Sequence, residues 1–297
     1  MMIWANAVLQ GVLLGGYYAL IACGLSFMYG VMGIINLAHG SLAVLAAFAL
    51  YVLAERFGVS PFLGLLVVLP AMAALGWLLH RLVLERSRRG DFLMPVLATF
   101  GLAIVLDNLL FEGFGANTRS LAPYIGTLSY GAWEFTDSLY VSTLGVLTLV
   151  VAVLMLGSLQ LLLTRTQLGR AIRAVSSDPD TAGLVGVDAS RTGAAATAIA
   201  LVTVGVAGAF LAMRTTFDPY AGSQELIFAF EAAVMGGAGS LWGTLIGGLV
   251  LGIAQNIGAQ INPQGSLIAG HAVFLVVLLA RWYAGQSPIR FRRRRPA

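Results

Sequence analysis

Long apolar segments recur along almost the whole chain, and a short polar stretch separates each one from the next. Eight of them match the length that a bilayer-spanning helix needs, about 17 to 25 residues. They lie at 6–29, 33–54, 61–80, 93–111, 139–163, 192–213, 241–260 and 266–284. A shorter ninth segment, 222–237, contains three polar side chains that are unusual in a membrane span, Gln224, Glu225 and Glu231. The pattern predicts an all-α polytopic membrane protein with eight or nine transmembrane helices in one domain, 1–297.

Composition supports a membrane location. Hydrophobic residues make up 59% of the chain and charged residues 10%, and the mean hydropathy is +0.88. A water-soluble domain usually carries about 25% charged residues. The first apolar segment has no basic residue before it, since Arg56 is the first in the chain, so we expect it to stay in the membrane rather than act as a signal peptide.

The basic residues exclude several chemistries. All 17 are arginine, so the chain has no lysine for a Walker A phosphate site or a Schiff base. If ATP drives transport, another chain must hydrolyse it, and we expect no cofactor here. No Ser, His and acid set suggests an enzyme, and the three histidines show no metal-ligand spacing. The single Cys23 gives no disulfide framework.

Arginine distribution predicts the topology. Fourteen of the 17 arginines lie in the loop 81–91, in the stretch 164–191 and in the tail from Arg281 onward, and basic loops stay cytoplasmic. This places the N-terminus outside and the Arg-rich tail, 285–297, inside, and it argues against nucleic-acid binding. The parity then requires 222–237 to cross as well, which gives nine crossings. Eight crossings and a re-entrant piece are the alternative.

The stretch 164–191 is the longest polar interruption on the predicted cytoplasmic side. It predicts two short helices, with Asp178 capping the second. A charged edge with Arg170 and Arg173 would lie opposite an apolar edge, which suits docking to a soluble partner. We name the candidate coupling residues as Leu168, Gly169, Arg170, Arg173 and Asp178. Taken alone, the stretch could equally be an amphipathic connector lying on the lipid surface.

Polar residues inside apolar segments are candidates for a translocation path. The stretch 30–41 is interrupted by glycine and polar residues. The tripeptides Val31-Met32-Gly33 and Gly40-Ser41-Leu42, the second of which ends one residue beyond this stretch, recur in 234–243. Paired interruptions of this kind can mark broken helices around a central site, although tight cytoplasmic turns would look the same. Broken or re-entrant segments are therefore expected near 30–41 and 222–243. The candidate path residues are Asn36, His39, Ser41, Asp107, Asn108 and Glu231.

Glycine spacing indicates close helix packing in the last third of the chain. Glycines recur every fourth residue, and small residues at this spacing let membrane helices approach closely. The expected packing positions are Gly239, Gly243, Gly247 and Gly252. The spacing alone says nothing about a substrate.

Three motifs together resemble a known family. They are Asn36-Leu37-Ala38-His39-Gly40, then 168–174 followed by Gly186-Val187-Asp188, and finally 236–240 followed by Gly243 and Gly247-Gly248. In this order and at these distances they resemble the LivH-type permeases of branched-chain amino-acid ABC transporters. The resemblance covers essentially the whole chain.

The resemblance implies a permease subunit of an ATP-driven importer in a bacterial inner membrane. Its partners would be a LivM-like second permease, LivG-like and LivF-like ATPases that bind ATP and Mg, and an extracytoplasmic binding protein. Related permeases carry other amino acids, urea or amides, so the substrate stays open. The competing interpretation is a self-contained secondary transporter or channel, in which Glu231 and His39 would exchange a proton.

Overall fold

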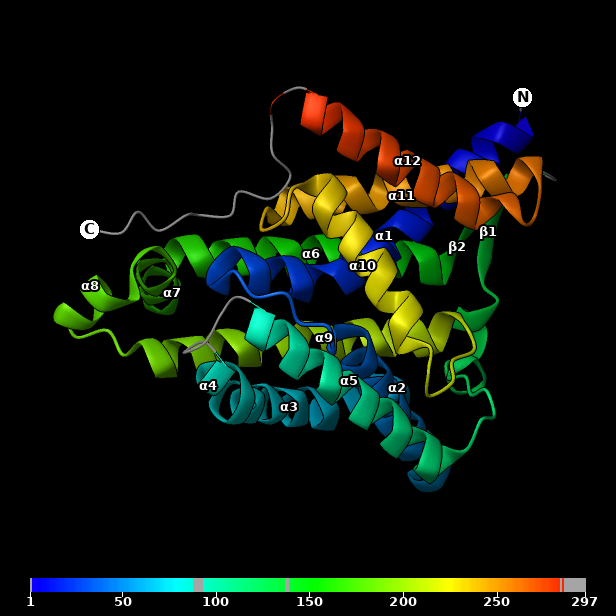
Figure 1. Cartoon of the computed structure of the whole chain (residues 1–297). Helices are drawn as coiled ribbons and strands as arrows, with labels where there is room; N and C mark the ends of the chain where they lie inside the picture. The colour runs from blue at the N-terminus through cyan, green and yellow to red at the C-terminus, as the bar shows by residue number, and fades with distance from the viewer. Residues whose placement is uncertain (1, 88–92, 137–138, 284, 286–297) are drawn as a thin grey trace.

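The computed structural model describes residues 2–87, 93–136, 139–283 and 285, and these are mostly helical (Figure 1). Among the described residues, eight helices are long and apolar enough to cross a membrane, as expected for an all-α polytopic protein. The helices are α1 (Met2–Met32), α2 (His39–Phe57), α3 (Pro61–Leu79), η1 (His80–Leu84), α4 (Glu85–Ser87), α5 (Leu93–Phe114), η2 (Ala122–Tyr124), η3 (Gly126–Ser129), α6 (Thr143–Arg165), α7 (Gln167–Ser177), α8 (Pro179–Leu184), α9 (Ala189–Arg214), α10 (Gly222–Gly236), α11 (Leu241–Ile261) and α12 (Gly265–Tyr283). Two antiparallel strands, β1 (Ala132–Thr136) and β2 (Leu139–Ser142), form a hairpin.

The molecule has two opposite ends, which we call the α7 face and the hairpin face. Figure 1 shows α7 and α8 at one end and β1 and β2 at the other. Helix α1 joins them, because Gln10 near its start donates a hydrogen bond to the Tyr140 carbonyl of β2 (2.7 Å) and Ser176 of α7 donates one to the Gly30 carbonyl near its end (3.5 Å). Helix α6 leads from β2 to α7, and α9 leads back to the hairpin face.

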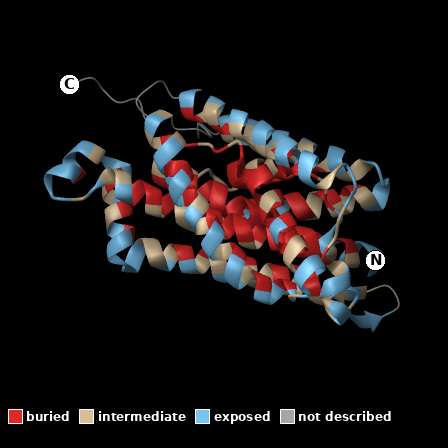
Figure 2. Cartoon of the chain, turned by 90° about the horizontal axis from the view of Figure 1, so that it is seen from below, coloured by how far each residue is buried: buried red, intermediate tan, exposed pale blue. Residues whose placement is uncertain are grey.

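Buried residues concentrate in the central helices α1 and α9, and Figure 2 shows this core surrounded by helices whose outer sides are exposed. Helices α5, α6 and α12 lie outermost and expose large apolar side chains such as Leu109, Leu154 and Ile268. An apolar exterior is what a bilayer requires of a spanning bundle, because lipid tails replace water as the surrounding solvent.

Glycines bring α1 and α11 into backbone contact. A Cβ on Gly15 would lie 2.5 Å from the Cα of Leu249, and one on Gly252 would collide with the backbones of Gly11 and Gly15. The glycines predicted to pack therefore contact different helices. Gly243 and Gly247 face α10, Gly252 faces α1, and Gly239 lies in the turn before α11 at φ +89°.

Two helices begin inside the bundle rather than at either end. The loops 33–38 and 215–221 return into the interior, and there the first turns of α2 and α10 meet, because a Cβ on Gly40 would collide with the Gly222 carbonyl. Helix α2 then runs to the hairpin face, where Tyr51 packs against Tyr124. Helix α10 runs the other way, and the turn after it contacts Gly30. We call residues 39–41 and Gly222 the helix junction.

The observed elements differ from the predicted ones at these breaks. The second apolar segment becomes helical at His39 instead of residue 33, and 139–142 is a strand. Helix α10 has 15 residues, too few to cross a hydrocarbon core of about 30 Å at 1.5 Å per residue. The loop 215–221 and α10 together carry the chain from one face to the other.

Residues 286–297 of the predicted Arg-rich tail lie outside the described residues.

Substituting Gly252 with alanine should destabilise the bundle. The added methyl group has no space between α11 and α1, and overpacking of this kind costs about 1–3 kcal/mol. We expect the melting temperature in detergent to fall by about 5 °C, using ~2–4 °C per kcal/mol. Gly101→Ala is the matched control, because nothing lies within 4 Å of a Cβ at that exposed helical position. Equal melting temperatures for both variants would contradict the packing described here.

Candidate functional site

The helix junction collects buried polar residues from the predicted path. Asn36 and His39 are fully buried. The Oδ1 atom of Asn36 accepts a hydrogen bond from Ala38 N (3.0 Å), and His39 Nε2 lies 2.7 Å from the Ile21 carbonyl in the middle of α1. These contacts fix the start of α2 against α1. The loop before α2 is held from the other side, since Leu37 N donates to the hydroxyl of Thr99 in α5 (3.1 Å).

Ser41 and Asp107 extend this cluster onto α5. Both are buried, and the Ser41 side chain lies beside the Asp107 carboxylate. Asn108 is not part of the cluster, because it points to the exposed side of α5 and bonds to the Ile104 carbonyl of its own helix (2.7 Å). The adjacent residues Asp107 and Asn108 therefore differ, because the first faces the interior of the bundle and the second faces its exposed side.

Three buried polar atoms of this cluster have no hydrogen-bond partner among the described residues. They are Asn36 Nδ2, His39 Nδ1 and Asp107 Oδ1. Such atoms are uncommon in a folded protein, because an unsatisfied buried donor or acceptor costs about 1–3 kcal/mol. A polar solute or water that reached the junction would find these atoms available.

Glu231 lies elsewhere in α10, with its side chain 4% exposed. Its Oε1 atom is 2.6 Å from Nδ1 of His271 in α12, and its Oε2 atom has no partner among the described residues. The pairing of Glu231 with His39, which a self-contained transporter would need, is not formed. His271 is 45% exposed on the outer side of the bundle, so the pair connects the interior to an outer helix.

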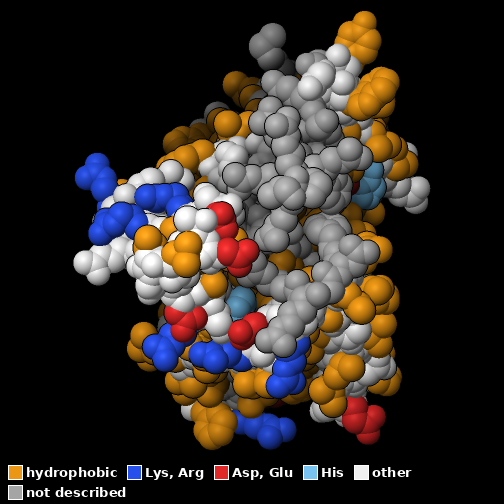
Figure 3. All heavy atoms as spheres, turned by 60° about the vertical axis from the view of Figure 1, so that its left-hand side comes forward, with side chains coloured by type: hydrophobic (Ala, Val, Ile, Leu, Met, Phe, Trp, Pro, Cys, Tyr) orange, Lys and Arg blue, Asp and Glu red, His pale blue; other side chains and the backbone are white. Residues whose placement is uncertain are grey.

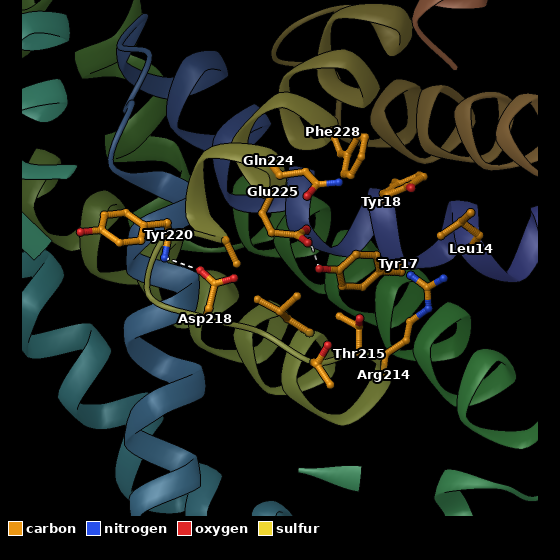
Figure 4. Close-up of a pocket in the computed structure, with 13 residues that line it drawn as sticks. Leu14, Tyr17, Tyr18, Arg214, Thr215, Asp218, Tyr220, Gln224, Glu225 and Phe228 are labelled. Carbon is orange, nitrogen blue, oxygen red and sulfur yellow. Dashed lines mark hydrogen bonds between the residues drawn. The ribbon is translucent and has the colours of Figure 1, made fainter. Parts of the chain in front are cut away.

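A cavity of about 510 Å³ opens near the hairpin face, between α1, the end of α9, the loop 215–221 and the first turns of α10 (Figure 4). Its charged side chains are Arg214, Asp218 and Glu225, and its apolar ones include Leu14, Leu211 and Phe228. We call it the outer pocket.

Tyr17 organises the charges of the outer pocket. Its hydroxyl donates a 2.6 Å hydrogen bond to Glu225 Oε2, and the Arg214 guanidinium lies 4.9 Å from its ring centroid. Figure 4 shows the tyrosine between the two charged groups. Tyr18 closes the back of the pocket, since it donates to Gln255 of α11 and packs on Phe228 at 5.0 Å between ring centroids.

The outer pocket ends at the helix junction. Ala221 lines the pocket, and the next residue, Gly222, contacts Gly40 and Ser41. On α1, Ile21 lies one turn beyond Tyr17 and holds His39. The pocket is thus open toward the hairpin face and closed, one helical turn further in, by the meeting of α2 and α10.

The α7 face carries two short helices, as the sequence predicts. The hydroxyl of Thr166 accepts a hydrogen bond from Gly169 N (2.9 Å) at the start of α7. Asp178 Oδ1 accepts from the backbone N atoms of Asp180 (3.1 Å) and Thr181 (3.2 Å) at the start of α8. Both caps satisfy helix N–H groups that have no partner within the helix.

Helix α7 has one buried and one exposed side. Gly169, Ile172 and Val175 are buried, and a Cβ on Gly169 would collide with the Leu162 carbonyl of α6. Arg170 and Arg173 are exposed, and Figure 3 shows basic and acidic side chains gathered on this face. Leu168 is 37% exposed beside them, and Leu184 at the end of α8 is 87% exposed.

Asp188 caps the start of α9 at this face and pairs with Arg191. It accepts a hydrogen bond from Arg191 N (3.0 Å), which keeps the pKa of its carboxyl below the usual value, and its other oxygen pairs with the Arg191 side chain (3.2 Å). The connection from α8 into α9 is therefore ordered by the same type of cap.

A bundle of membrane-length helices with a pocket at one face, a polar junction inside and a capped helix pair at the opposite face is what a transport protein of the permease class requires. A family described as "Branched-chain amino acid transport system / permease component" matches residues 7–281. The chain belongs to this family, which confirms the resemblance inferred from its motifs.

Two relatives match over nearly their whole length, and a third matches over about two thirds of its length. The permease protein BraD of the high-affinity branched-chain amino acid transport system of Pseudomonas aeruginosa is 30% identical over 295 residues, covering 94% of each chain. The corresponding protein LivH of Escherichia coli K12 is 29% identical over 289 residues, covering 91% of each chain. LivM of the same organism is 26% identical over 287 residues, covering 89% of this chain and 66% of LivM.

The sequence motifs contain some of the residues in this arrangement and not others. Asn36, His39, Ser41 and Asp107 do lie together. Glu225 was noticeable in the sequence only as an unusual charge in a short segment, and Tyr17 and Arg214 belong to no motif. An aromatic residue and an arginine at the ends of apolar segments also anchor ordinary spans, so no sequence signal marked them as a pocket.

Replacing Glu231 with leucine should reduce substrate uptake. The change leaves His271 without its partner, and it removes a buried carboxylate from the centre of α10. We expect uptake into cells to fall at least several-fold while the protein still reaches the membrane. Glu55→Leu is the control, because Glu55 is exposed near the hairpin face and also bonds to a single side chain, Tyr51. Full uptake by the Glu231 variant would show that this carboxylate has no role in transport.

Proposed function

We propose that the protein is the permease subunit of an ATP-driven importer that moves branched-chain amino acids into the cytoplasm. The observation that carries the proposal is the family match over residues 7–281. The arrangement of the chain supports it, because the outer pocket and the helices α7 and α8 lie at opposite faces and the helix junction closes the route between them.

The partners follow from what this chain lacks and from the family it belongs to. With no lysine, it has no Walker A site, so ATP and Mg would bind to two separate ATPases, one LivG-like and one LivF-like. A LivM-like permease would form the second half of the channel, in keeping with the sequence similarity between LivM and this chain. An extracytoplasmic binding protein would deliver the substrate at the hairpin face.

A movement of the ATPase would be transmitted to the helix junction through the contacts that α7 makes with α6 and α1. Helix α7 rests on the end of α6 through Gly169 and on the end of α1 through the bond from Ser176 to Gly30. Helix α1 in turn carries Tyr17 at the outer pocket and Ile21 at the junction. A displacement of α7 would therefore be transmitted along a single rigid helix to both sites.

Reversing the charges of Arg170 and Arg173 should uncouple the transporter. These exposed side chains would meet the ATPase, and like or unpaired charges at such a contact cost several kcal/mol. In proteoliposomes containing the whole complex, the wild type should take up leucine only with ATP and binding protein. The double change to glutamate should reduce uptake and ATP hydrolysis at least ten-fold and release the ATPase more easily in detergent.

Arg56→Glu is the control for this experiment, because Arg56 is also exposed but lies in the last turn of α2 near the hairpin face. It should leave uptake and assembly unchanged. Leucine uptake driven by a proton gradient without any ATPase would favour a secondary transporter instead. Unchanged ATPase binding, hydrolysis and uptake in the double variant would show that α7 and α8 are a solvated connector.

We propose further that the α7 face is cytoplasmic and the N-terminus is outside, on the arginine distribution. A tag at Ala297 should then be protected from protease in intact spheroplasts, and a tag inserted near Asn117 should be cleaved. Permeabilised cells provide the control in which both tags are accessible. Cleavage of the Ala297 tag in intact spheroplasts would reverse the orientation and exclude α7 as the ATPase contact.

A further inference from the structure

We propose that the outer pocket binds the zwitterionic head group of the transported amino acid, with Arg214 facing the α-carboxylate and Glu225 facing the α-ammonium group. This rests on the proposed function, and it adds a substrate site within the permease itself. The size fits, because the cavity of about 510 Å³ falls within the ~300–1,000 Å³ typical of small-molecule sites.

Arg214 is available for a ligand carboxylate. It ends α9, is exposed, and has no ion pair within 4 Å among the described residues. The ring of Tyr17 holds its guanidinium at the pocket without neutralising it. A guanidinium forms two parallel hydrogen bonds with a carboxylate, which makes arginine well suited to a carboxylate ligand.

Glu225 complements Arg214, because its carboxylate can accept hydrogen bonds from an ammonium group. The residue is 8% exposed, and the hydrogen bond from the Tyr17 hydroxyl is its one side-chain bond among the described residues. A hydroxyl does not neutralise a carboxylate, and a buried charge is costly without a partner of opposite sign. The ammonium group of a ligand would supply that partner.

Tyr17 keeps the two charges apart, as Figure 4 shows. Arg214 contacts the ring and Glu225 contacts the hydroxyl, so the pair does not collapse into an internal salt bridge. Because they are separated, Arg214 and Glu225 can both pair with one ligand that carries a negative and a positive group. The apolar side chains Leu14, Leu211 and Phe228 offer a surface for an aliphatic side chain.

The chain contains a second set with the same chemistry, which provides a matched control. Arg119 lies 5.5 Å from the ring centroid of Tyr51, and the hydroxyl of Tyr51 donates to Glu55 at 2.6 Å. None of these three residues lines the outer pocket. Substitutions there remove the same groups from the same kind of contact without touching the proposed site.

The test measures leucine binding by the purified permease–ATPase complex in nanodiscs, without the binding protein, using tritiated leucine and two competitors. Leucinamide lacks the carboxylate charge, and 4-methyl-2-oxopentanoate lacks the ammonium group. Each should compete at least ten-fold more weakly than leucine with the wild-type complex. Arg214→Met and Glu225→Gln should each lower leucine affinity at least ten-fold, and Arg214→Lys should retain more affinity than Arg214→Met.

Arg119→Met and Glu55→Gln should bind leucine like the wild type, and size-exclusion chromatography verifies assembly of each complex. Wild-type affinity in Arg214→Met or in assembled Glu225→Gln would overturn the proposal. A loss in Glu225→Gln alone would indicate a simple cation site, and it would overturn the proposal too. If Glu225→Gln does not assemble, Arg214→Met and the two competitors still decide the question.

The proposed function is tested separately by ATP-dependent leucine uptake of the wild type. A complex that takes up leucine but shows no binding at millimolar leucine, or equal competition by all three compounds, would overturn the pocket assignment and leave the proposed function intact. Absence of leucine uptake would overturn the proposed function first.

Discussion

A membrane offers the backbone no water, so every N–H and C=O group inside it needs a partner within the protein. The rest of this structure depends on how two non-helical loops meet that requirement. In the loop 33–38, Asn36 bonds to Ala38 N and Thr99 bonds to Leu37 N. In the loop 215–221, Phe217 exchanges both backbone bonds with Arg119. Helices α1 and α9 lie at the centre, and α3, α5, α6, α11 and α12 lie around them.

The sequence predicted the fold class, the eight long helices and the paired helices α7 and α8, because each depends on local signals. Apolar length defines a span, and Thr166 and Asp178 cap helices through neighbouring backbone atoms. The break near 30–41 was expected from its glycine and polar residues, but the exact start of α2 at His39 was not, because Ile34, Ile35 and Leu37 continue the apolar pattern of a helix. The hairpin of β1 and β2 was missed for a similar reason, since Leu139–Ser142 continues an apolar segment without a break.

The candidate site was predictable only in part. Asn36, His39 and Ser41 are close in sequence, and a polar cluster inside an apolar segment is visible without a structure. The partner of Glu231 was not predictable, since His271 lies 40 residues away on another helix. The outer pocket combines Tyr17, Arg214 and Glu225 from three helices, and each of these residues is ordinary in its own segment. Only the return of the chain at 215–221 brings them together.

The meeting of α2 and α10 also has an electrostatic consequence. Both helices start at the junction and run apart, so the positive ends of two helix dipoles, each equivalent to about half an elementary charge, converge in the low-dielectric interior. A proton or metal ion moving through this point would be repelled by both ends, as at the half-helices of water channels. A solute with no net charge would not be repelled in this way. The two helix starts therefore make the junction less favourable for a cation than for a solute without net charge.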